Sequence, residues 1–87
     1  MTDINKTLEE RGSKYGKASD NARVTRQLMR IVEETNPNLS DMHHLTLYMI
    51  MHKISRMVCG DQWFRDNPHD IAGYATLLEE FIKDVEQ

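Results

Sequence analysis

The spacing of apolar residues between positions 41 and 59 constrains the fold most. One helical face is indicated by Leu47, Ile50, Met51, Ile54 and Val58. Ser40 is an expected N-cap, and Gly60 is expected to end the helix in a left-handed conformation. We expect this helix to be the central and most buried one, because further apolar residues lie on its other faces: Leu45, Tyr48, Met49 and Met57.

Two further segments before residue 40 have helical spacing. A short helix is predicted at about 3–14, and its weak stripe ends at Gly12 and Gly16. The stretch 11–19 has the glycines and serines of a flexible connector. A second helix is predicted at about 20–35, with Ser19 as N-cap and a core-facing stripe of Val24, Leu28, Ile31 and Val32.

The last helix has the clearest start signal in the chain. Asn67 is a predicted N-cap and Pro68 a predicted first helical residue, which places this helix at about 68–85. Gly73 interrupts the pattern and is expected to mark close approach to a neighbouring helix. The predicted core stripe is Ile71, Tyr74, Ala75, Leu78, Ile82 and Val85.

Length and composition agree with an all-α fold. A chain of 87 residues has room for one core, so we expect a single helical domain over 1–87. No long alternating pattern predicts a strand. The expected architecture is a small bundle of three longer helices plus a short N-terminal helix.

Charge and cysteine content limit the classes of partner. The net charge of −3 argues against a general nucleic-acid binder, because such proteins gain affinity by neutralising phosphates. The composition is not that of a membrane-spanning chain. The single cysteine, Cys59, and the absence of a leader pattern favour a reducing cytoplasm.

Self-association is also expected, because the apolar helix faces exceed what so short a chain covers easily. Leu77 and Phe81 lie off the main stripe of the last helix and are expected to be exposed. We therefore predict a homodimer that forms through the exposed parts of the second and fourth helices.

Several charged residues share one face of the central helix and outline a site for an anion. His52, Lys53 and Arg56 lie within two turns of one another, with Asp61 and Asp70 as nearby carboxylates. In the structural alternative, these cations pair with the carboxylates and close the bundle. A second basic stripe, Arg23, Arg26 and Arg30, is expected either to meet phosphates or to be a solvated face.

Metal-binding patterns are weak in this sequence. His43 and His44 are adjacent and diverge around the helix, and the other histidines lack the spacing of a zinc site, so no metal site is predicted. The carboxylates Glu33, Glu34, Glu79, Glu80 and Asp84 loosely resemble those of the all-α nucleoside triphosphate pyrophosphatases, but the paired Glu-x-x-Glu turns are missing. No cofactor can be named from the residues.

Three motifs occur in an order that resembles a family of small proteins of tailed phages and prophages. They are Glu10-Arg11-Gly12-x-x-Tyr15-Gly16, then His52-Lys53-Ile54-x-Arg56 with Gly60-Asp61, then Asp66-Asn67-x-x-Asp70-Ile71-Ala72-Gly73-Tyr74-Ala75. The pattern is similar to the nucleotide-modification-associated domain of phage genomes and covers nearly the whole chain. Pro68 departs from it, since an aromatic residue is usual there.

The resemblance implies a ligand site made of Arg11, Tyr15, Lys53, Arg56, Asp61, Asp70 and Tyr74. It implies a phage or prophage protein of the host cytoplasm that binds a nucleotide or another phosphate-bearing ligand and is an accessory of nucleotide metabolism. Tyr15 would close over the ligand, or alternatively be a buried residue that caps a helix end. Two other functions stay open: a non-enzymatic protein that occupies a host or defence factor, and a pyrophosphatase-like hydrolase.

Overall fold

The computed structural model describes residues 2–86, with side chains described from residue 4 onward. It contains four helices and, within these residues, no strand, which confirms the all-α class. The helices are α1 (Thr2–Tyr15), α2 (Ala18–Thr35), α3 (Asp41–Cys59) and α4 (Asp66–Glu86).

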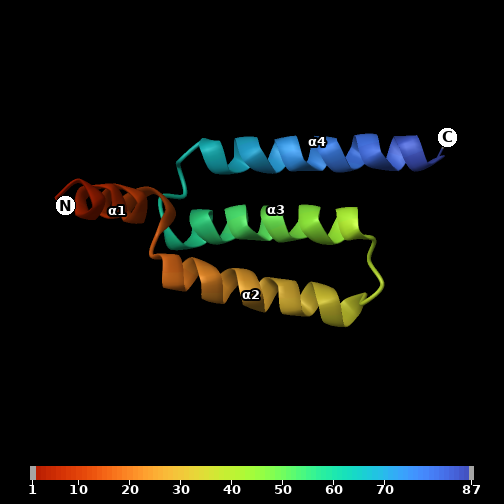
Figure 1. The fold of residues 1–87 in the computed structure, drawn as a ribbon, viewed down its shortest axis with the longest axis horizontal. Coiled ribbons are helices and arrows are strands. Elements are labelled where there is room, and N and C mark those ends of the chain that lie inside the picture. Colours follow the sequence, from red (N-terminus) through yellow and green to blue (C-terminus); the bar gives the residue numbers. More distant parts are fainter. Residues whose placement is uncertain (1, 87) are drawn as a thin grey trace.

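The three long helices form an open layer with α3 in the middle (Figure 1). The three long helices α2, α3 and α4 run in alternating directions, and α1 projects from the end at which α2 begins and α3 finishes (Figure 1). Within the described chain, α2 and α4 each pack against α3 but do not contact each other. The central position of α3 is confirmed, and the predicted bundle is an open layer rather than a closed one.

The helix starts show which capping predictions were right. The Ser40 hydroxyl accepts a hydrogen bond from the His43 backbone N–H at 3.0 Å, which confirms this N-cap. Ser19 is not a cap, because α2 begins at Ala18 after Lys17. The prediction for Asn67 was also wrong: α4 begins at Asp66, and the Asn67 side chain is fully buried in its first turn.

Two glycines lock the α1–α2 connection onto the end of α3. Gly16 has a φ of +82°, and a Cβ placed there would lie 2.6 Å from the carbonyl oxygen of Cys59. A Cβ on Gly60 would lie 2.5 Å from the carbonyl oxygen of Lys14. Gly60 itself has a φ of −117°, so the left-handed conformation predicted for it is wrong. The predicted flexible connector is helical up to Tyr15, and this contact holds its end.

The interior of the layer is mostly polar. Met29 is the single buried apolar side chain in the described chain, at 4% exposure. The other buried residues are Asn21, Thr25, Thr46, Ser55 and Asn67. In the apolar stripe predicted to face the core on α2, Ile31 is 64% exposed, whereas Val24, Leu28 and Val32 are half-buried. Short polar side chains let the backbones of neighbouring helices approach, so the larger apolar ones lie on the open faces.

Helix α4 corrects three predictions about exposure and packing. Phe81 is not free, because its ring packs edge-on against the His43 ring of α3. Leu77 is exposed as predicted, and Val85 of the predicted core stripe is exposed too. A Cβ on Gly73 would meet nothing within 4 Å in the described structure, so this glycine marks no close approach.

Candidate functional site

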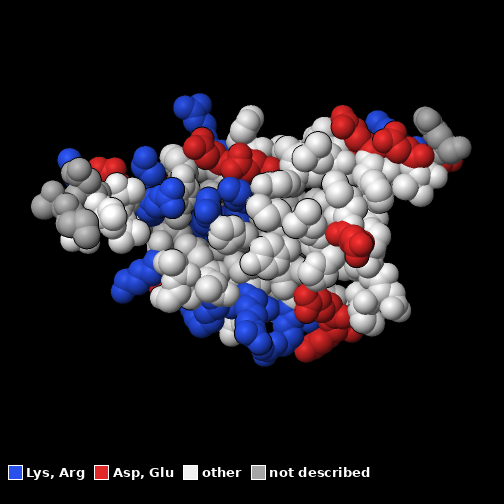
Figure 2. Space-filling model, viewed as in Figure 1, with Lys and Arg blue, Asp and Glu red and all other residues white. Residues whose placement is uncertain are grey.

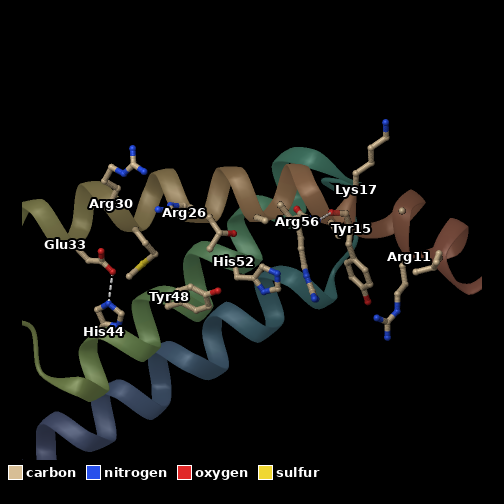
Figure 3. A pocket seen from close by; sticks show the side chains of 18 residues that line it. Arg11, Tyr15, Lys17, Arg26, Arg30, Glu33, His44, Tyr48, His52 and Arg56 are labelled. Atoms are coloured by element: carbon tan, nitrogen blue, oxygen red, sulfur yellow. Dashed lines mark hydrogen bonds and ion pairs between the residues drawn. The ribbon is translucent and has the colours of Figure 1, made fainter.

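A groove with a volume of about 940 Å³ lies between α1, α2 and α3. This volume is in the range of small-molecule sites, about 300–1,000 Å³. Figure 3 shows Tyr15, Tyr48, His52 and Arg56 arranged along α3 and the end of α1, with Lys17 and Arg30 extending outward at the rim.

The lining of the groove is strongly positive in a chain of net charge −3. Glu33 is its single carboxylate, whereas five cationic side chains line it: Arg11, Lys17, Arg26, Arg30 and Arg56. None of these five forms an ion pair within the described residues. Figure 2 shows Lys and Arg gathered over the edge formed by α2 and the end where α1 meets α3. The groove therefore concentrates uncompensated positive charge.

Arg56 is held in place by aromatic rings. Its guanidinium carbon lies 4.5 Å from the centroid of the Tyr15 ring. Tyr15 in turn packs edge-on against Phe64, with the ring centroids 5.4 Å apart. A guanidinium over an aromatic face keeps all its N–H donors available, so Arg56 is oriented without losing its capacity to bind an anion.

His52 lies beside Arg56 in the groove lining. Partial burial lowers the pKa of His52 below its ordinary value of 6.5, and the positive charges of Arg56 and Lys53 lower it further. The ring is therefore neutral near pH 7 and acts there as one hydrogen-bond donor and one acceptor.

A buried hydrogen-bond network fixes the groove floor. The Asn21 side-chain amide donates to the backbone carbonyl of Tyr15 at 2.7 Å. The Ser55 hydroxyl lies 3.1 Å from Asn21 Oδ1 and 2.6 Å from the His52 carbonyl oxygen. These bonds connect α1, α2 and α3 directly below the groove, so the relative positions of Tyr15, Arg56 and His52 are set by buried polar contacts.

Thr25 is a buried groove residue with an unused polar atom. Its side chain is 3% exposed, and its hydroxyl has no hydrogen-bond partner in the described chain. Buried hydroxyls are normally paired, since leaving one unpaired costs about 1–3 kcal/mol. Thr25 lines the groove, and its unpaired hydroxyl lies buried beneath the groove surface.

The far end of the groove is closed by a hydrogen bond between α2 and α3. His44 Nε2 lies 2.9 Å from Glu33 Oε1. His43 points instead toward α4, where its ring contacts Phe81. The two adjacent histidines diverge as the sequence predicts, and Glu33 is engaged with His44 rather than with an arginine of the groove.

The structure brings together three of the seven predicted site residues. Arg11, Tyr15 and Arg56 all line the groove. Lys53 and Asp70 lie outside it and pair with each other across α3 and α4, with Lys53 Nζ 2.9 Å from Asp70 Oδ2. The hydrogen bond from Lys53 is the main cause that lowers the pKa of Asp70. Lys53 and Asp70 therefore follow the alternative expected from the sequence, in which a cation pairs with a carboxylate and joins two helices.

The remaining two predicted residues lie apart from the groove. Asp61 belongs to the α3–α4 connection, where its carboxylate accepts from the Trp63 backbone N–H at 2.9 Å and its own N–H donates to the Lys14 carbonyl oxygen at 2.9 Å. Tyr74 lines a shallow depression on α4 next to Asp70. Neither contributes to the groove lining.

Sequence reasoning missed part of the groove. Arg26 and Arg30 were recognised only as a basic stripe, and Arg23 of that stripe does not line the groove. Tyr48 and Thr25 were not predicted as site residues. Spacing along α2 alone cannot show which of its faces lies opposite Tyr48 and Arg56.

No three His, Cys, Asp or Glu side chains of the described chain lie together as a metal site. None of the described helices is long and apolar enough to cross a membrane.

Comparison with known proteins gives a family but no activity. No curated protein and no solved structure matches the chain. A family model described as a domain of unknown function, DUF6378, matches residues 1–82. Because the match covers nearly all of the 87 residues, the chain belongs to the DUF6378 family.

Proposed function

We propose that the groove between α1, α2 and α3 binds a nucleotide. The observation that carries the proposal is the set of five unpaired cationic side chains around a groove with one carboxylate. Arginine matches phosphate geometry with paired N–H donors, and such charge-assisted bonds are stronger than neutral ones. The proposal differs from the sequence expectation in that Arg26 joins Arg56 as a phosphate-binding residue, whereas Lys53 and Asp70 lie outside the groove.

Tyr48 is a candidate aromatic ring on which the base of the nucleotide stacks. This ring is 45% exposed, lines the groove and has no ring partner in the described structure. Stacking of a base on an aromatic side chain contributes about 1–3 kcal/mol. His52, one turn along α3, supplies a neutral hydrogen-bonding group between Tyr48 and Arg56.

The resemblance of the sequence motifs to a phage family supports placing this binding in the nucleotide metabolism of a phage or prophage, in the cytoplasm of its host. The function proposed is binding. The arrangement of residues supports no particular bond-breaking step.

Thermal shift with three probes tests the proposal: ATP, tripolyphosphate and adenosine. A ligand at ten times its Kd adds about 1.4 kcal/mol to the native state. For a domain of this size, that raises the Tm by about 6–11 °C. We expect a shift with ATP, a smaller one with tripolyphosphate and none with adenosine, because the phosphates supply the charge and the base adds stacking.

Arg26→Ala and Arg23→Ala form a matched pair of variants. Both remove one exposed arginine from α2, but only Arg26 lines the groove. We expect Arg26→Ala to weaken the ATP shift and Arg23→Ala to leave it unchanged. Equal losses in both variants would mean general electrostatic attraction and contradict a defined site. No shift with any probe would contradict the proposal and favour the alternative of a protein that occupies a host factor.

Tyr48→Leu tests the base platform separately. This variant keeps an apolar side chain but removes the aromatic face. We expect it to reduce the ATP shift to the size of the tripolyphosphate shift and to leave the tripolyphosphate shift unchanged. An unchanged ATP shift would show that the base lies elsewhere.

A further inference from the structure

The side of α2 that faces away from the groove is apolar. Two positions along an α-helix correspond to a rotation of about 200°, so residues two positions from a groove residue lie on the opposite side. The groove is lined by Arg26 and Met29. The residues two positions from these two are Val24, Gln27, Leu28 and Ile31, and all except Gln27 are apolar.

Helix α3 shows the same division. Its groove residues include Tyr48, His52 and Arg56. The residues two positions further along are Ile50, Ile54 and Val58. Val58 is 71% exposed and Ile31 on α2 is 64% exposed. We call these six residues the apolar face: Val24, Leu28, Ile31, Ile50, Ile54 and Val58.

The chain also has more accessible surface than a compact monomer of its mass. The accessible surface is 6737 Å². A folded monomer of 10.2 kDa is expected to expose about 5,300 Å². The excess is about 1,400 Å², whereas a typical stable interface takes about 800 Å² from each partner. Part of the excess comes from the projecting α1 (Figure 1).

The radius of gyration points the same way. It is 15.2 Å, against about 12 Å for a compact domain of this length. With a single buried apolar side chain in the described residues, one copy has almost no apolar core of its own. In the apolar face, Ile31 and Val58 are exposed and the other four residues are half-buried.

We propose that the apolar face binds the same face of a second copy of this chain, so that the missing core forms between two copies. A twofold pair is self-complementary, which lets one uncharged apolar surface cover another without a specific charged partner. The interface differs from the one the sequence predicts, because α3 contributes to it and Phe81 does not. The groove remains on the outer side of each copy and is accessible in the dimer.

Sedimentation and thermal unfolding of the full chain test the proposal. We expect a particle of twice the chain mass at high micromolar concentration, and a Tm that rises with protein concentration because unfolding separates the copies. A wild type that sediments as a monomer at this concentration, with a Tm independent of concentration, overturns the proposal. The apolar face would then be a binding surface for a different protein.

Val58→Glu identifies the surface, with Leu45→Glu as the control. Both side chains are more than half exposed in the single copy, at 71% and 57%. Leu45 is three positions before Tyr48 and therefore lies on the groove side of α3. We expect Val58→Glu to give monomers or to abolish folding, and Leu45→Glu to remain a dimer. Ile31→Glu repeats the test from α2, and a dimer that survives both apolar-face variants overturns the assignment.

Discussion

Replacing Gly16 by alanine should detach the α1–α2 connection from the end of α3. The φ of Gly16 is +82°, and a Cβ would lie 2.6 Å from the carbonyl oxygen and 2.8 Å from the Cβ of Cys59. Neither atom can rotate away, because the oxygen belongs to the backbone and the Cβ is fixed by the backbone. The connection must therefore move as a whole.

The magnitude has two parts. A residue with a Cβ in the left-handed region costs about 1–2 kcal/mol relative to glycine. Overpacking against a neighbour that cannot shift costs about 1–3 kcal/mol more. The expected loss for Gly16→Ala is therefore about 2–5 kcal/mol. Gly60→Ala should lose only the second part, because the φ of Gly60 is −117°, which any residue adopts.

Amide hydrogen exchange reports the loss where it occurs. The Asp61 N–H donates to the Lys14 carbonyl oxygen across this contact. A loss of 2 kcal/mol corresponds to a decrease in protection of about thirtyfold, so Gly16→Ala should reduce the protection of this amide by at least that factor. Urea unfolding followed by circular dichroism at the same time shows how much of the loss reaches the whole domain.

Gly12→Ala and Gly73→Ala are the controls. Both glycines lie inside helices, and a Cβ on either would meet nothing within 4 Å of the described chain. Each should gain about 0.5–1 kcal/mol, since alanine is the better helix former. If Gly16→Ala behaved like these controls and kept the Asp61 amide protected, the contact would not constrain the connection.

Three further outcomes are expected. Asn21→Ala should cost about 1–3 kcal/mol in urea unfolding, because it removes the buried bond to the Tyr15 carbonyl, whereas Ser13→Ala at an exposed bond should change stability by less than about 0.5 kcal/mol. Because the pKa of His52 is lowered in the folded state, the unfolded chain takes up a proton on this ring more readily, and the free energy of unfolding decreases as the pH falls through 6.5. His52→Asn should flatten this part of the plot of unfolding free energy against pH. An unchanged slope would contradict the argument that burial lowers the pKa of His52. The effects of Lys53→Ala and Asp70→Ala on the free energy of unfolding should be non-additive in a double-mutant cycle. This coupling should disappear as the pH falls below 3.8 and through the lowered pKa of Asp70, because the carboxylate then becomes protonated. Additive effects would mean that the pair is not formed in solution.

The sequence alone was sufficient for the helices and for part of the site. Apolar periodicity, together with capping and helix-ending residues, predicted four helices. The predicted bounds of α3 agree residue for residue with the structure, because Ser40 and Gly60 flank a long regular pattern. Arg11, Tyr15 and Arg56 were predicted together and do line one groove. The helices depend on local backbone preferences, which periodicity reveals. The three groove residues were predicted because they belong to motifs that occur together in the sequence.

The tertiary structure decided which helix faces meet. Periodicity identifies an apolar stripe but not its partner, so Ile31 and Val58 were expected in the core and lie exposed, while Thr25 and Ser55 are buried between helices. The same limit hid Arg26 and Tyr48, whose meeting across the groove depends on the rotation of α2 against α3. That rotation is set by the close packing of short polar side chains and by the Gly16–Gly60 contact, both of which join residues far apart in the sequence.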